Sequence, residues 1–119
     1  MNHNMKLNPS PFTAIETGKK NIELRLNDEK RQQIKIDDTI TFTNTVDSEQ
    51  KLFTKVIALH HAPSFAELFT TIPFSVCGFD GALSPEEVAN AMRQYYSEEA
   101  EMKYGALGIE LVLIDQCEE

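Results

Sequence analysis

The alternation of apolar and polar side chains predicts a long β-hairpin in the middle of the chain. Residues 39–46 alternate three apolar side chains with four threonines, the two-residue period of a half-buried strand, and only Asn44 interrupts the apolar face. Residues 51–60 are rich in apolar side chains that favour strands and predict the second strand of the hairpin. The polar segment 47–49 predicts the connecting turn. The apolar side chains of the first strand are Ile40, Phe42 and Val46.

Two more strands are predicted, one on each side of this hairpin. In residues 21–26 three apolar side chains alternate with a polar set that includes Glu23 and Arg25, so the two sets point to opposite faces. Residues 107–114 are apolar on both faces, which is typical of a central strand covered on both sides. His3 lies in an N-terminal segment that we expect to be frayed. The apolar side chains of residues 21–26 are Ile22, Leu24 and Leu26.

Serines and glycines mark the ends of the predicted helices. Ser84 is followed by a proline and, at the third position, by a glutamate, a capping box that predicts the start of a helix ending near residue 95. Gly18 is expected to end the first helix and Gly105 the last one, because glycine readily adopts positive φ. The four predicted cap residues are Ser10, Ser64, Ser84 and Ser97. The predicted buried face of the third helix consists of Val88, Met92 and Tyr95.

These elements predict an α+β fold, with residues 1–119 forming a single domain. We expect about five or six strands that curl into a small barrel, which removes exposed edges, and roughly three or four helices packed at its rim. Residues 70–83 contain a proline and two glycines and are expected to form an irregular loop. A chain of 119 residues is long enough to bury a core of its own.

The charge of the chain argues against an extended nucleic-acid interface but favours a local one. Nineteen acidic residues against 11 basic ones give a net charge of −8, whereas a broad phosphate-binding surface needs a basic excess. Six of the 11 basic residues nevertheless lie within residues 19–35. This clustering favours a single ligand-facing cleft over a broad binding surface.

Missing sequence features narrow the class of protein. No apolar run reaches the roughly 18 residues of a membrane-spanning helix, and the first residues lack the apolar part of a signal peptide, so we expect a cytoplasmic protein. Cys77 and Cys117 stand alone, and His60 and His61 would point to opposite faces of a strand, so neither pair predicts a metal site. No glycine-rich phosphate or dinucleotide motif is present, and no cofactor is expected.

One charged segment, between the first predicted helix and the hairpin, carries the candidate chemistry. Lys20, Glu23 and Arg25 combine a point charge, an acceptor or general base, and a planar donor fork, a set that can hold a polar planar ligand such as a nucleobase. Lys30 and Arg31 lie just beyond the strand. The alternative is a surface ion pair worth about 0–1 kcal/mol, followed by a solvated turn.

Three tyrosines in the C-terminal half are candidates for a stacking wall beside these charges. Tyr95, Tyr96 and Tyr104 each offer an aromatic face on which a base can stack. The alternative is that Tyr95 belongs to the core and that the other two tyrosines are half-exposed without a binding role.

The spacing of Gly18, Lys20, Glu23 and Arg25 resembles the signature of the ASCH domain family (activating signal cointegrator homology), in particular of its small single-domain microbial members. The Lys-Tyr-Gly segment at 103–105 extends this resemblance toward the C-terminal end. The resemblance implies a small β-barrel similar to that of PUA domains, with a cleft that binds a short RNA, a nucleotide or a nucleoside. The candidate ligand-binding residues are Lys20, Glu23, Arg25, Lys30, Arg31, Tyr96 and Tyr104.

The resemblance also leaves an enzymatic alternative open. Some small ASCH proteins hydrolyse N4-acetylcytidine with a lysine, a threonine and a glutamate, and the lysine corresponds to Lys20. The threonine position holds Glu23, and the segment that would supply the glutamate has Asp80 as its only acidic residue. Two of the three positions therefore depart from the pattern, and Lys20 with Glu23 would have to form the catalytic pair.

Overall fold

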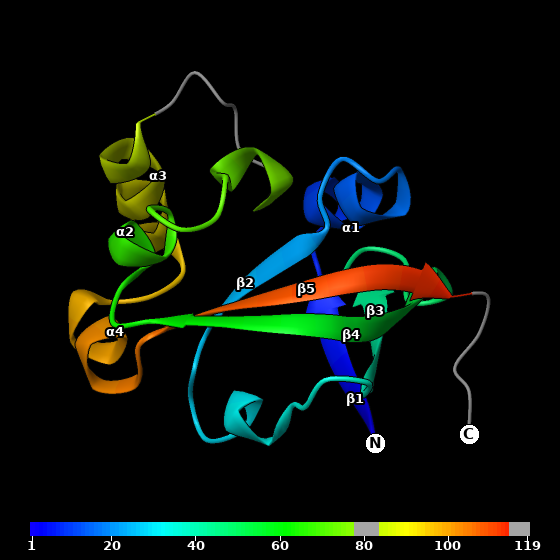
Figure 1. Cartoon of the computed structure of the whole chain (residues 1–119). Helices are drawn as coiled ribbons and strands as arrows, with labels where there is room; N and C mark the ends of the chain where they lie inside the picture. Colours follow the sequence, from blue (N-terminus) through cyan, green and yellow to red (C-terminus); the bar gives the residue numbers. More distant parts are fainter. Residues whose placement is uncertain (78–83, 115–119) are drawn as a thin grey trace.

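One curled sheet forms the centre of the fold in the computed structural model, which describes residues 1–77 and 84–114 (Figure 1). Within these residues, five strands pair in the order β1-β3-β4-β5-β2, with β1 and β3 parallel and the other neighbours antiparallel. The strands are β1 (Asn2–Leu7), β2 (Ile22–Leu26), β3 (Thr39–Asn44), β4 (Lys51–Ala62) and β5 (Ala106–Ile114). The half-barrel that they form confirms the predicted α+β fold.

Helices and 3-10 turns connect these strands. The helices are α1 (Pro9–Glu16), α2 (Phe65–Leu68), α3 (Pro85–Ala91) and α4 (Glu98–Tyr104), and the 3-10 turns are η1 (Arg31–Gln33), η2 (Phe74–Cys77) and η3 (Met92–Gln94). The serine caps predicted for α2, α3 and α4 are confirmed, because each accepts a backbone hydrogen bond from the first turn. The predicted Ser10 cap is wrong: Asn8 precedes the helix, and Ser10 lies inside it.

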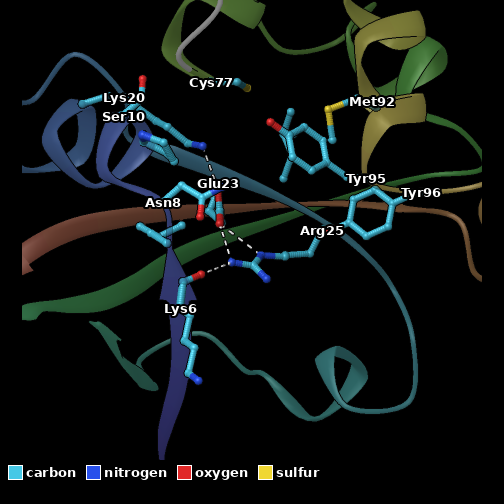
Figure 2. Close-up of a pocket in the computed structure, with 14 residues that line it drawn as sticks. Lys6, Asn8, Ser10, Lys20, Glu23, Arg25, Cys77, Met92, Tyr95 and Tyr96 are labelled. Atoms are coloured by element: carbon cyan, nitrogen blue, oxygen red, sulfur yellow. Dashed lines mark hydrogen bonds and ion pairs between the residues drawn. The ribbon is translucent and has the colours of Figure 1, made fainter. Parts of the chain in front are cut away.

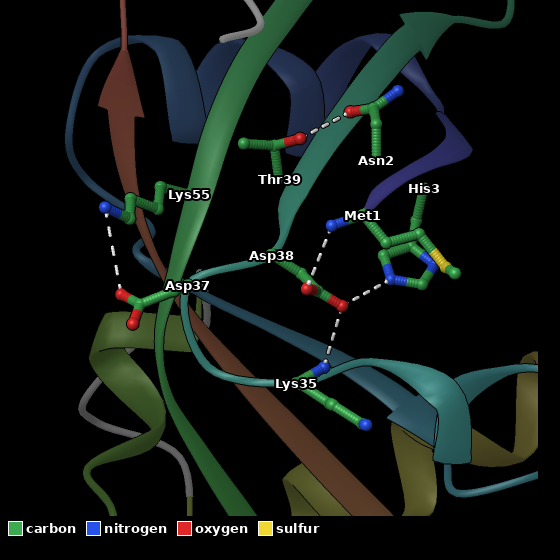
Figure 3. Close-up of polar contacts among 8 residues, drawn as sticks. All are labelled: Met1, Asn2, His3, Lys35, Asp37, Asp38, Thr39 and Lys55. Carbon is green, nitrogen blue, oxygen red and sulfur yellow. Dashed lines mark hydrogen bonds and ion pairs between the residues drawn. The ribbon is translucent and has the colours of Figure 1, made fainter. Parts of the chain in front are cut away.

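The N-terminal segment forms the edge strand β1, so the predicted frayed tail is also wrong. β1 pairs with β3, and its alternate side chains Met5 and Leu7 are buried. Asp38 holds the start of the strand, with Oδ1 3.3 Å from the Met1 ammonium and Oδ2 2.9 Å from Nε2 of His3 (Figure 3). A segment with only two alternating apolar side chains is too short for its periodicity to predict a strand.

Two residues predicted to face the core, Val46 and Tyr95, are 79% and 65% exposed. β3 ends at Asn44, whose Oδ1 accepts a hydrogen bond from the backbone N–H of Val46 at 2.9 Å, so the chain turns before Val46 reaches the apolar face. α3 ends at Ala91, and η3 then advances by about 120° per residue instead of about 100°. This change of period rotates Tyr95 outward.

The core has two parts, on the two faces of the sheet. The inner cluster, inside the curl, includes Met5, Leu7, Phe12, Ile40, Phe42, Val56, Leu107 and Ile109. The outer cluster, which packs β2 against the helices, includes Ile22, Leu24, Leu26, Phe65, Leu68, Val88 and Met92. β5 contributes to both clusters up to Leu111, as predicted for a strand covered on both faces, but Val112 and Leu113 beyond it are 41% and 47% exposed, so the covering ends there. Because the apolar face of β2 turns toward the helices, its polar face points into the curl.

Candidate ligand-binding site

Lys20, Glu23 and Arg25, which we call the buried trio, meet on and beside β2 (Figure 2). The Nζ atom of Lys20 lies 2.7 Å from Oε1 of Glu23, and Arg25 donates to Oε2 of Glu23 from Nε at 3.0 Å and from Nη2 at 2.8 Å. The Glu23 side chain is 5% exposed, and those of Lys20 and Arg25 are 10% and 17% exposed. The alternative of a solvated surface ion pair is therefore wrong.

The curl of the sheet explains why these charges are buried. Glu23 lies opposite Ile109 in the β2–β5 register, and Arg25 lies opposite Leu107. Both therefore share the inner face with core side chains, beside the seam where the edge strands β1 and β2 approach without pairing. Arg25 bridges this seam, because its Nη2 donates a hydrogen bond to the backbone carbonyl of Lys6 on β1 at 3.0 Å.

The turn after α1 brings Lys20 to the trio. Gly18 adopts φ +82°, which confirms its predicted role at the end of the helix. The backbone N–H of Lys20 then donates to the carbonyl of Ala14 at 3.0 Å, which folds the chain back over the helix end. Lys20 therefore approaches Glu23 from the α1 side, whereas Arg25 approaches it along the strand (Figure 2).

Glu23 remains ionised despite its burial. Burial alone raises the pKa of the Glu23 carboxyl, but the charges of Lys20 and Arg25, together with their hydrogen bonds, hold this pKa below its ordinary value. The buried trio thus carries one net positive charge and more donors than acceptors. A ligand rich in acceptor atoms complements such a set.

A cavity of about 360 Å³, the ligand cavity, opens above the buried trio. This volume lies within the range of about 300–1,000 Å³ that is usual for small-molecule sites. Its walls include Lys6 of β1, Ser10 of α1, Cys77 of η2, and Tyr95 and Tyr96 after η3. The cavity therefore lies at the junction of the sheet with three connecting segments.

The tyrosines contribute unequally to this cavity. Tyr96 lines it and stacks on Phe65, with ring centroids 5.8 Å apart. Burial raises the pKa of the Tyr96 phenol, so its hydroxyl stays protonated at neutral pH and able to donate. Tyr95 lies exposed at the rim. Tyr104 is not among the residues that line this cavity. It packs beside the outer cluster, with the Lys103 ammonium over its ring.

Lys30 and Arg31 lie at a second depression, the basic hollow, of about 350 Å³. Its lining residues are Asn4, Met5, Lys6, Arg25, Lys30, Arg31 and Thr43. Lys6 and Arg25 line both the hollow and the ligand cavity, so the two spaces adjoin. The structure thus divides the predicted charged residues between two neighbouring spaces.

The model of the family described as ASCH domain matches residues 5–115. The chain belongs to the ASCH domain family. This membership confirms the resemblance carried by the signature around Lys20, Glu23 and Arg25. No curated protein matches the chain.

Two solved structures resemble this ASCH domain over nearly its full length. The hypothetical protein PH0355 is 38% identical with a TM-score of 0.84, covering 96% of this chain and 100% of that one. Protein PF0455 from Pyrococcus furiosus is 34% identical with a TM-score of 0.75, covering 98% and 100%. ASCH from Zymomonas mobilis is 19% identical with a TM-score of 0.56, covering 98% and 68%, which shows a likeness of fold.

Several lining residues of this ASCH domain, among them Lys6, Ser10 and Cys77, are not predicted as site residues from sequence. In the sequence, Ser10 is typical of a helix cap and Cys77 of a small core residue. No sequence pattern therefore indicates that either one lines a site. Burial raises the pKa of the Cys77 thiol to about 12, so it is not a thiolate at neutral pH. Asp80 and Cys117 lie outside the described residues.

Two further features of the ASCH domain concern metals and membranes. Among the described residues, no three histidine, cysteine, aspartate or glutamate side chains gather as metal ligands. His60 instead pairs with Glu110 at 2.9 Å, away from the ligand cavity. No helix in the described part of the chain combines the length and apolar composition that crossing a membrane requires.

Proposed function

We propose that the protein binds one nucleotide unit, as part of a short RNA or as a free nucleotide or nucleoside, in the ligand cavity. The observation that carries this proposal is the buried trio at the base of a cavity of suitable size. Charges are costly to bury, and their concentration in a cleft is typical of functional sites. Membership of the ASCH family, whose fold is of the RNA-binding PUA-like type, supports the same proposal.

The chemistry of the cavity suits a nucleobase. Lys20 and Arg25 present donors to ring nitrogen and carbonyl acceptors, while the Glu23 carboxylate accepts from an exocyclic amino group. Tyr95 offers an exposed ring at the rim for stacking, and Tyr96 forms a wall supported by Phe65. The net charge of −8 favours a short ligand, because an extended RNA would meet an acidic surface.

A titration followed by amide chemical shifts tests this proposal. The four common nucleosides, their monophosphates and a short single-stranded RNA are added to the labelled protein. We expect shifts in residues 18–25 and around Tyr95 and Tyr96, and about tenfold weaker binding or more for Arg25→Lys, which loses the planar fork. Lys19→Gln removes an exposed charge outside both spaces and should leave affinity unchanged. Shifts that are absent, or that avoid residues 18–35, would contradict the proposal.

A second candidate function is hydrolysis of a modified nucleoside such as N4-acetylcytidine. The 2.7 Å contact between Lys20 and Glu23 favours it, because a buried lysine–carboxylate pair can transfer a proton at a bound substrate. In this reaction water adds to the acetyl carbon, the C–N bond breaks, acetate leaves, and the amino group of cytidine takes up a proton.

Chromatography of cytidine released from N4-acetylcytidine tests the hydrolytic candidate. Glu23→Gln should then lose turnover while keeping affinity for N4-acetylcytidine, since it retains the shape and an acceptor but not the base. Binding of N4-acetylcytidine without any release of cytidine would reject hydrolysis and leave the binding function in place.

A further inference from the structure

The basic hollow concentrates positive charge in an otherwise acidic protein. Lys6, Arg25, Lys30 and Arg31 all line it, and no acidic residue is among its lining residues. The whole chain has only 11 lysines and arginines against 19 acidic residues. Four cations from three separate segments of the chain have thus been brought to one depression.

Not all of this charge is neutralised by neighbours. Arg25 is committed to Glu23, and Arg31 pairs with Asp28 at a longer distance of 3.4 Å. The Nε atom of Arg31 is buried and has no hydrogen-bond partner. Lys6 and Lys30 make no ion pair with any described residue. The hollow therefore presents unpaired donors that an anion would satisfy.

The position of the hollow relates it to the ligand cavity. Arg25 and Lys6 form the boundary that both spaces share. Figure 2 shows the Lys6 side chain extending away from Glu23, so its ammonium group lies on the hollow side of this boundary. Thr43 and Asn4 add neutral hydrogen-bonding groups to the same lining.

We propose that the basic hollow binds a phosphate group of the ligand whose base occupies the ligand cavity. Lys6, Lys30 and Arg31 are the donors. This inference rests on the proposed function for the position of the base, and it narrows the ligand class from nucleosides in general to nucleotides or RNA. Arg25 separates the two subsites and contacts the ligand at the junction of base and sugar-phosphate.

Calorimetric titration of nucleosides against their 5′-monophosphates tests the phosphate site. We expect at least one monophosphate to bind about tenfold tighter than its nucleoside, with the gain reduced by salt. The double variant Lys30→Gln/Arg31→Gln, at two residues that line only the hollow, should abolish this gain and keep the nucleoside affinity. The matched control Lys19→Gln/Lys103→Gln removes the same charge from exposed positions outside both spaces and should keep the gain.

Inorganic phosphate separates failure of this inference from failure of the proposed function. Phosphate alone should shift the amides of residues 28–31 and Thr43, whether or not any base enters the ligand cavity. A gain with 5′-monophosphates indicates a terminal phosphate, and a gain confined to a trinucleotide RNA indicates an internal phosphodiester; both support the inference. The inference would be overturned if the amides of the hollow did not respond to phosphate. It would also be overturned if the double variant still bound the monophosphate more tightly than the nucleoside. Either result could occur while nucleosides still bind beside the trio.

Discussion

Glu23 determines how the site responds to charge removal and to acid. Glu23→Gln leaves Lys20 and Arg25 buried beside a neutral amide, and we expect it to lower the free energy of unfolding by about 3 kcal/mol. Because the folded-state pKa of Glu23 lies below the ordinary value of 4.5, its stabilisation is present above pH 4.5 and is lost as the pH falls through the folded pKa.

Urea unfolding of both proteins between pH 7 and pH 3 measures this effect. The wild type should lose its advantage over Glu23→Gln as the pH falls below 4.5. A variant as stable as the wild type at pH 7 would show that the carboxylate does not stabilise the fold.

The sequence predicts the members of the buried trio but not their burial. The spacing of Lys20, Glu23 and Arg25 places the last two on one face of a strand. Whether that face meets water depends on the curl of the sheet and on β1, which approaches only through its pairing with β3. A local pattern holds no information about this distant pairing. For the same reason, the sequence does not predict that Lys6 of β1 lines both the ligand cavity and the basic hollow.

At the scale of helices and turns, Gly18 and Gly105 have similar φ but are expected to differ in how much stability a substitution by alanine removes. A Cβ added at Gly18, which has φ +82°, would meet open space, whereas a Cβ at Gly105 would lie 2.9 Å from the Ala62 carbonyl oxygen. Gly105 also has φ +80° and ψ 176°, a region essentially restricted to glycine. Gly18→Ala should therefore cost about 1 kcal/mol and Gly105→Ala about 2 kcal/mol or more. Denaturant midpoints measure both, and equal losses would argue against the steric difference.

Glu101 links two helices and gives a second prediction at this scale. Its buried carboxylate accepts the backbone N–H of Phe65 at 2.6 Å and pairs with Arg93, so α4 satisfies the first turn of α2. Glu101→Ala should destabilise the protein by about 3 kcal/mol, and Glu101→Gln by less, because the amide oxygen still accepts the Phe65 hydrogen bond. Thermal unfolding checks the order of the two variants, and an Ala variant as stable as the Gln variant would contradict it.

The elements themselves are largely predictable because their signals are local. The helix caps at Ser64 and Ser84 and the threonine-rich first strand of the hairpin each depend on residues within one turn or one strand. The prediction fails where two neighbouring residues could both cap the helix. Asn8 and Ser10 each precede a proline, and the sequence alone does not show which of them begins α1. It also fails at β1, whose stability comes from β3 rather than from its own pattern.

Over the whole molecule, the Asp38 contacts anchor the edge strand β1 to the sheet. Burial raises the pKa of Asp38, but hydrogen bonds from His3, the Lys35 backbone and the Met1 ammonium outweigh it and hold the pKa below 3.8. The anchoring is therefore present above pH 3.8 and is lost as the pH falls through the folded-state value. Figure 3 shows that neighbouring Asp37 pairs instead with Lys55.

Amide hydrogen exchange tests this anchoring. Asp38→Asn should lower the protection of β1 amides about tenfold or more relative to those of β4, since local opening becomes easier by the free energy of the lost contacts. Asp37→Asn is the matched control, because Asp37 is largely exposed and pairs with Lys55 of β4. Equal protection of β1 in the wild type and in Asp38→Asn would contradict the prediction.

The strand order also has a consequence for the time at which the site forms. β2 is made early in synthesis, yet its partner β5 is the last described strand, and Ile22 pairs with Glu110. Until β5 arrives, the side chains of Lys20, Glu23 and Arg25 remain hydrated, because no neighbouring strand holds them inside the curl. A nascent chain that ends before residue 106 therefore has every charged residue of the trio but not the folded candidate site. Formation of the candidate site therefore waits for the last strand of the sheet, in the final stage of folding.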